Sequence, residues 1–123
     1  MTRFDQSWCD QLAGAVGGLG TESPVRILYV VTETDEGKVA FHLQIDNEST
    51  EATAGKLPRG EKADVTVTAK EAVLAAIWSG DRNRDEAFMA GDIKVEGAYN
   101  QWLDVLVPLF AAPDWSKAWA SQT

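Results

Sequence analysis

The chain has 123 residues, of which 11 are Lys or Arg and 19 are Asp or Glu, so its formal charge at pH 7 is −8. This length is typical of one domain, and we expect residues 1–123 to form a single domain. One Cys cannot form an intrachain disulfide, and one His cannot anchor a zinc site built from several His or Cys ligands. The acidic balance argues against sequence-independent nucleic-acid binding, because affinity for phosphates comes mainly from clustered Lys and Arg.

The sequence carries no sign of a membrane-spanning or targeting segment. No stretch approaches the about 18 apolar residues that a span needs, and residues 1–12 lack the charged and then apolar order of a signal peptide. The C-terminal Ser121-Gln122-Thr123 is not a peroxisomal tripeptide. We therefore expect a cytoplasmic protein without stable membrane insertion. Its net charge would repel anionic lipid surfaces at long range, although a local apolar or basic patch could still touch a bilayer.

The first third of the chain predicts a helix followed by a hairpin. Apolar residues recur at helical spacing along one stripe: Phe4, Trp8, Leu12, Val16 and Leu19. From Val25 to Thr32 the period changes to two, with apolar residues on both faces, which is typical of a central strand. Residues 38–46 alternate strictly after the Asp35-Glu36-Gly37 turn, so they complete a hairpin.

Two further strands are predicted before the next helix. Residues 49–57 form a weaker strand that Pro58-Arg59-Gly60 ends, and residues 63–69 alternate once more. We expect the four strands to pair in chain order as an antiparallel meander.

Beyond these strands the pattern becomes helical. Residues 70–79 predict a helix that stops at Gly80. Residues 85–90 predict a short helix that cannot be stable alone, so Phe88 and Met89 must be held by tertiary packing.

The remaining elements complete the predicted fold. Residues 93–97 alternate as a fifth strand at the sheet edge, and residues 99–110 form a helix with a broad apolar face. Pro113 begins a final helical turn that carries Trp115 and Trp119. The predicted fold class is α/β in the α+β sense: a five-stranded, mostly antiparallel sheet covered by helices.

Three residues bear groups that perform catalysis in other proteins, and each has a plainer interpretation. His42 falls on the polar side of its strand, where a base or metal ligand and an ordinary surface residue both fit. Cys9 could pair with it as a nucleophile, but nothing local supports the pairing, and we favour a small, half-buried helix residue. Asp104 on the last long helix would have a raised pKa against apolar surface, whereas a solvated outer face needs no such role.

Large apolar side chains are concentrated in the C-terminal half of the chain. They are Trp78, Phe88, Met89, Trp102, Phe110, Trp115 and Trp119. Such residues usually form core. On several converging elements they also suit the wall of a cavity, because ligand sites are concave and mostly apolar.

One segment of this half resembles the sterol-carrier-protein-2 family. It is Ala87-Phe88-Met89-Ala90-Gly91-Asp92-Ile93-Lys94-Val95-Glu96-Gly97, which is similar to the family's AF..G.(I/L)K(V/I).G run. Residues 63–68 and the helix over 71–80 match the strand and glycine-ended helix that precede this run in the family. The similarity is strongest over residues 63–110 and extends more loosely back to Trp8.

The resemblance implies five strands covered by helices around an apolar tunnel for a sterol, fatty acid, fatty acyl-CoA or phospholipid. It implies no catalysis and no cofactor or metal. Gly91 and Gly97 would serve the backbone of the motif. The predicted ligand-binding residues are Leu74, Ile77, Trp78, Phe88, Met89, Trp102, Leu103, Leu106, Phe110 and Trp115.

Three hypotheses for the function stay open. The first is a non-catalytic carrier of a hydrophobic ligand, with residues 113–123 as a lid. The second is a cofactor-free enzyme resembling ketosteroid isomerase that uses Asp104 with Tyr29 or Tyr99, although that fold ends in strands. The third is an interaction domain whose tryptophans fill the core. A homodimer is compatible with each hypothesis.

Overall fold

The computed structural model describes residues 5–16, 24–34, 37–46, 50–98, 100, 102 and 113–121. In chain order its elements are α1 (Gln6–Val16), β1 (Val25–Thr34), β2 (Gly37–Ile45), β3 (Thr50–Ala54), β4 (Val65–Lys70), α2 (Glu71–Ser79), α3 (Arg84–Met89), β5 (Ile93–Gly97) and α6 (Pro113–Ser121). β3 is shorter than the strand predicted over residues 49–57. The helix predicted over residues 99–110 lies mostly outside the described residues.

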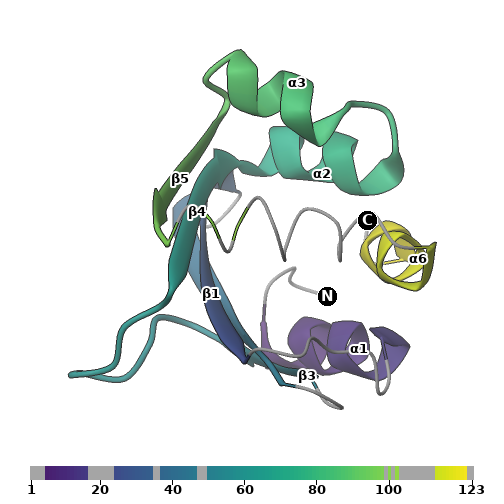
Figure 1. The fold of residues 1–123 in the computed structure, drawn as a ribbon. Coiled ribbons are helices and arrows are strands. Elements are labelled where there is room, and N and C mark those ends of the chain that lie inside the picture. The colour runs from purple at the N-terminus through teal and green to yellow at the C-terminus, as the bar shows by residue number, and fades with distance from the viewer. Residues whose placement is uncertain are drawn as a thin grey trace.

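The strands among the described residues form one five-stranded mixed sheet in the order β3-β2-β1-β4-β5 (Figure 1). β2 pairs antiparallel with β1 and β3, and β5 pairs antiparallel with β4. In contrast, β4 runs parallel to β1, with Ile27 opposite Val65 and Thr32 opposite Lys70. The mostly antiparallel sheet is confirmed, but the predicted four-strand meander is wrong at its last step.

The composition of β1 explains its central position. Ile27, Tyr29 and Val31 point to one face of the sheet and are buried, whereas Leu28 and Val30 are half-buried on the other. A strand that is apolar on both faces fits best between two neighbours. Alternation shows which face a residue occupies but not which strand lies beside it. The segment between β3 and β4 carries the chain from one side of β1 to the other.

Helices α1, α2 and α6 lie on one side of the sheet (Figure 1). We call the sheet surface under them, on which Tyr29 lies, the inner face and the opposite surface the outer face. α2 contacts β1 and β4, and α6 contacts α1 and α2. α1 lies along β3, where the Gln6 side chain donates to the carbonyl of Ala52 (3.1 Å) and accepts from the amide of Ala54 (3.0 Å). The hydrophobic core therefore fills the space between the inner face and the helices.

The ends of α2 and α3 follow their sequence signals. α2 stops at Gly80 as predicted, and the Gly80 amide donates to the carbonyl of Ile77 (3.2 Å). Asn83 caps the N-terminus of α3, where its side-chain oxygen accepts hydrogen bonds from the amides of Asp85 (2.9 Å) and Glu86 (3.1 Å). A side-chain cap of this kind stabilises a helix by about 1 kcal/mol.

The packing predicted for α3 is correct only in part. Ala87 is fully buried and Phe88 is half-buried, but Met89 is 86% exposed. Two positions along a helix rotate the side chain by about 200°, so burial of Ala87 directs Met89 to solvent. The prediction that packing holds Met89 is therefore wrong.

Candidate functional site

Six aromatic side chains from five described elements meet between the inner face and the helices. We call this group the aromatic cluster: Trp8 of α1, Tyr29 of β1, Phe41 of β2, Trp78 of α2, and Trp115 and Trp119 of α6. All six are buried. The period of each element places them there, because Tyr29 is in phase with the buried Ile27 and Phe41 is in phase with the buried Leu43.

The rings of the aromatic cluster contact one another directly. Tyr29 stacks on Phe41 with ring centroids 4.9 Å apart, and Trp78 stacks on Trp119 with centroids 4.5 Å apart and planes within 7°. Trp8 meets Phe41 edge-on at 5.0 Å, and Tyr29 meets Trp119 edge-on at 5.8 Å. Each such pair contributes about 0.5–1.5 kcal/mol beyond its buried area. The stacking distance leaves no room for another group between Trp78 and Trp119.

Two ionisable groups among the described residues of this layer, Tyr29 and Cys9, are held in their neutral forms. Burial raises the pKa of the Tyr29 hydroxyl, an effect that the charge of Arg84 opposes. Burial, with smaller contributions from Asp10 and Asp5, raises the pKa of the Cys9 thiol from 9.0 to about 12. Since the thiolate is the nucleophilic form, this environment suppresses the reactivity of Cys9. The layer is thus apolar and uncharged.

Of the Cys9 and His42 pair considered for catalysis, only Cys9 lies in this layer. Cys9 is fully buried rather than half-buried, and it lies on the helical side of the sheet. His42 lies on the outer face, as predicted, with its Nδ1 3.0 Å from the carbonyl of Gly55. The sheet therefore separates the two members of the proposed Cys–His pair. Asp104 and Tyr99 lie outside the described residues, and no group of three or more His, Cys, Asp or Glu side chains within them could hold a metal ion.

The structure brings together several of the predicted ligand-binding residues. α2 presents Leu74, Ile77 and Trp78, all buried, and Trp102 and Trp115 are buried as well. Phe88 is half-buried, and Met89 is exposed on the surface. Leu103, Leu106 and Phe110 lie outside the described residues.

Four members of the aromatic cluster were not among the predicted ligand-binding residues: Trp8, Tyr29, Phe41 and Trp119. A signal for two of them was present. Tyr29 and Phe41 stand directly opposite each other in the β1–β2 register, and both alternate onto the inner face. A hairpin register combined with the strand period would have placed both rings under the helices.

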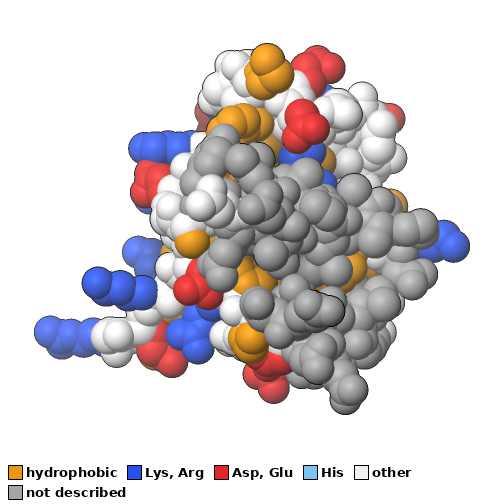
Figure 2. Space-filling view, in the orientation of Figure 1, with side chains coloured by type: hydrophobic (Ala, Val, Ile, Leu, Met, Phe, Trp, Pro, Cys, Tyr) orange, Lys and Arg blue, Asp and Glu red, His pale blue; other side chains and the backbone are white. Residues whose placement is uncertain are grey.

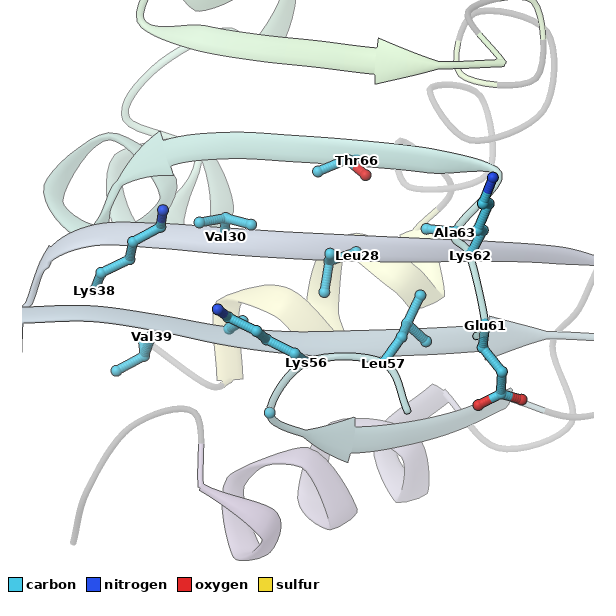
Figure 3. A pocket seen from close by; sticks show the side chains of 12 residues that line it. Leu28, Val30, Lys38, Val39, Lys56, Leu57, Glu61, Lys62, Ala63 and Thr66 are labelled. Atoms are coloured by element: carbon cyan, nitrogen blue, oxygen red, sulfur yellow. The ribbon is translucent and has the colours of Figure 1, made fainter. Parts of the chain in front are cut away.

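A hollow lies on the outer face, and none of the described residues predicted to bind a ligand lines it. It is a groove of about 560 Å³ between β1, β2, the first part of β4 and residues 55–63 (Figure 3). Its floor is apolar, with Leu28 and Val30 from β1, while Lys38, Lys56 and Lys62 stand around it. In the described part of the chain, no helix is long and apolar enough to cross a membrane.

A five-stranded mixed sheet with helices over one face and an apolar, uncharged layer between them defines a small α+β domain of the kind that encloses hydrophobic groups. Residues 22–103 match the model of the SCP-2 sterol transfer family. This match covers well over half of the chain, and the chain therefore belongs to that family. The chain therefore has the fold of this family and not that of ketosteroid isomerase.

Solved structures of sterol carrier proteins share this fold. A crystal structure of sterol carrier protein 2 superposes with a TM-score of 0.67 at 15% identity, over 97% of this chain and 98% of that one. The solution structure of palmitated SCP2L2 from Aedes aegypti gives a TM-score of 0.65 at 15% identity, over 85% of this chain and 92% of that one.

The same fold also occurs within a larger enzyme. The sec-alkylsulfatase Pisa1 from a Pseudomonas species matches 83% of this chain at 22% identity and a TM-score of 0.55, but this chain spans only 13% of its length. No curated protein matches the sequence of this chain.

Proposed function

We propose that this chain binds and carries a hydrophobic ligand in the layer between the inner face and the helices, and that it does so without catalysis. The ligand classes are a fatty acid, fatty acyl-CoA, sterol or phospholipid. The observation that carries the proposal is the match of residues 22–103 to the SCP-2 sterol transfer family. The palmitated state of the related Aedes aegypti protein supports a fatty acyl ligand in particular.

The physical character of the inner layer supports the same function. The buried side chains of Leu74, Ile77 and Trp78 form a continuous apolar wall on α2. An alkyl chain that leaves water for such a wall gains about 0.8 kcal/mol per CH₂ group before the costs of association. Since Tyr29 and Cys9 stay neutral there, neither side chain adds a charge that would oppose the burial of an alkyl chain.

Helix α6 is the element that a ligand would displace. Trp119 lies against Trp78 and Tyr29, so it occupies the surface that an alkyl chain would cover. α6 packs mainly against the helices α1 and α2. It starts at Pro113, which has no backbone amide hydrogen and therefore cannot donate the hydrogen bond that would continue a preceding helix. We therefore assign residues 113–123 the role of a lid that exchanges ring contacts for ligand contacts.

The carrier function is tested by ligand titration of the purified, delipidated protein. Palmitate, palmitoyl-CoA, cholesterol and phosphatidylcholine are each added while tryptophan fluorescence is recorded, and native mass spectrometry gives the stoichiometry. Saturable one-to-one binding of at least one class is expected, with a change in emission because the ligand separates Trp78 from Trp119. Absence of binding for all four classes would overturn the proposal.

The role of the lid is tested separately by the rate of ligand release. Trp119→Phe keeps a ring in the core but reduces the area of its contact with Trp78. We expect it to release a bound fatty acid about tenfold faster. Lys117→Ala, an exposed position on the same helix, is the matched control and should leave the rate unchanged. If truncation before Pro113 leaves both the affinity and the release rate unaltered, the lid proposal is refuted, while the proposed carrier function stands.

The closed-core interaction domain is the second candidate, and the stacking of Trp78 on Trp119 at 4.5 Å favours it. Rings this close already satisfy one another without a ligand. On this alternative, the four lipid classes leave the fluorescence unchanged, and Trp119→Phe alters stability alone.

A further inference from the structure

The outer face of the sheet carries an apolar centre that none of the described helices covers. Leu28 lies between His42 of β2 and Thr66 of β4, and Val30 lies between Ala40 and Thr68. Leu28 and Val30 are only half-buried. Two neighbouring large aliphatic side chains at the middle of an otherwise polar sheet face are the floor of the groove.

The wall of this groove is built by residues 55–64, and hydrogen bonds fix both of its ends. At the first end, the amide of Gly55 donates to the carbonyl of Ala40 (2.8 Å). At the other end, the amide of Asp64 donates to the carbonyl of Arg26 (2.8 Å), and its carboxylate accepts from the Arg26 amide (2.9 Å). Leu57 from this segment closes over the floor (Figure 3). The groove is therefore preformed, and its volume of about 560 Å³ lies in the range of small-molecule sites.

The charge around the groove is opposite to that of the whole chain. Of the six lysines in the sequence, Lys38, Lys56 and Lys62 line the groove. Among the described residues these three form no ion pair, whereas Lys70 pairs with Glu33 and Lys94 with Glu96 (3.3 and 3.0 Å). The one acid of the lining, Glu61, lies 3.6 Å from Arg26. Figure 2 shows Lys and Arg side chains gathered on the side of the molecule where this segment projects.

An apolar floor with a cationic rim matches a molecule that has one alkyl chain and one anionic head. The floor would cover part of the chain, and the lysines would attract the head in a molecule whose net charge of −8 otherwise repels anions. A flat bilayer fits less well, because the segment between β3 and β4 projects from the sheet beside Leu28 and Val30 (Figure 1), which leaves these side chains at the bottom of a groove. We propose that the outer groove is a second binding site, for a single-chain fatty acid carboxylate, on the opposite side of the sheet from the inner layer.

The test uses sodium dodecanoate below its critical micelle concentration and the full-length protein with ¹³C-labelled methyl groups. Methyl signals of Leu28, Val30 and Leu57 report the outer groove, while those of Ile27 and Leu74 report the inner layer. We expect saturable shifts of the outer reporters, weakened by added salt because the attraction is electrostatic. Outer reporters that stay unshifted while the inner ones saturate would overturn this proposal and leave the carrier function intact. Inner reporters that stay unshifted while the outer ones move would support the outer groove and contradict binding of dodecanoate in the inner layer.

Two charge-matched variants separate a specific groove from general attraction. The triple variant Lys38→Gln, Lys56→Gln, Lys62→Gln should raise the dissociation constant at the outer reporters at least tenfold. The control triple Lys70→Gln, Lys94→Gln, Lys117→Gln removes the same charge from exposed positions outside the groove and should change it less than twofold. Equal effects of the two variants would refute the site.

A vesicle arm decides between the fatty acid and a membrane. Vesicles of phosphatidylglycerol that perturb the outer reporters, with dodecanoate leaving them unshifted, would contradict the fatty acid site in favour of membrane docking. Lys56→Gln alone, on the exposed segment, serves as the second variant and should raise the dissociation constant about threefold.

Discussion

The thiol of Cys9 is buried in α1 and carries a pKa raised to about 12, mainly through burial and secondarily through Asp10 and Asp5. In the unfolded chain it ionises near its ordinary value of 9.0. The unfolded state therefore releases a proton that the folded state retains, and the contribution to stability, complete below about pH 9, is lost as the pH rises toward 12. Tyr29, whose pKa is also raised by burial, acts in the same direction at higher pH.

We predict that Cys9→Ala reduces the alkaline loss of stability. Between about pH 8 and about pH 10.5 the thiol accounts for about 2 kcal/mol of the decrease in the free energy of unfolding. Urea denaturation of both proteins at the two pH values measures the difference. The free energy of unfolding of the variant should fall by about 2 kcal/mol less than that of the parent chain. An identical fall in both proteins would show that the thiol ionises as readily in the folded state as in the unfolded state.

At the residue scale, the sequence predicts burial best where one element alone decides which side chains face the core. Leu74, Ile77 and Trp78 fall on one face of α2, and their burial follows from helical spacing alone. The predicted burial of Met89 is wrong because the orientation of the six-residue α3 depends on which of its side chains packs against the neighbouring structure. That side chain is Ala87. The contacts of Trp119 depend on where α6 packs, and no local sequence pattern specifies that position.

At the scale of elements, the contact between β4 and β5 explains a glycine of the family motif. Gly97 ends β5 with φ of +98°, and the amide of the next residue, Ala98, donates to the carbonyl of Asp64 (2.6 Å). A Cβ at Gly97 would collide with that carbonyl oxygen, which belongs to backbone and cannot turn aside. Gly97 thus allows β5 to close against the start of β4.

We predict that Gly97→Ala destabilises the protein by about 3 kcal/mol or more, because it combines a left-handed backbone with a backbone collision. Gly91→Ala is the matched control, since Gly91 has a φ of +83° but open space around its Cβ position. Gly91→Ala should destabilise the protein only by the cost of a left-handed backbone at Ala, which is about 1–2 kcal/mol. The difference in urea midpoint between the two variants measures the collision. Equal midpoints would contradict the close approach of the strands.

The fold shows the same division between local and distant causes. The positions of most described strands and helices, the stop at Gly80 and the central character of β1 follow from the period and composition of single segments, whereas β3 ends earlier than predicted. The parallel pairing of β4 with β1 does not, because it depends on where residues 55–64 carry the chain. A meander and the observed order place the same residues on the same faces, so the alternation alone cannot separate them.

At the scale of the whole molecule, the two faces of the sheet have different electrostatic character. The inner face meets an apolar layer in which Tyr29 and Cys9 stay neutral, whereas the outer groove gathers half of the lysines of an acidic chain. The sheet lies between the two, so a fatty acid in the groove does not contact the aromatic cluster. Occupancy at one face can therefore be measured without interference from the other.

The order of strands in the whole sheet leads to a prediction about hydrogen exchange. β1 has a hydrogen-bonded neighbour on each side, whereas β3 is at an edge, where Gln6 covers only the amide of Ala54 by a side-chain bond. In the meander that the sequence suggested, β3 would be internal instead. We predict that peptides covering residues 26–32 exchange at least tenfold more slowly than peptides covering residues 50–54, as measured by mass spectrometry of the unliganded protein. Internal strands open only with the whole sheet, while an edge strand opens locally. Equal protection of the two segments, or slower exchange in β3, would contradict the parallel pairing of β1 with β4 that places β1 at the centre.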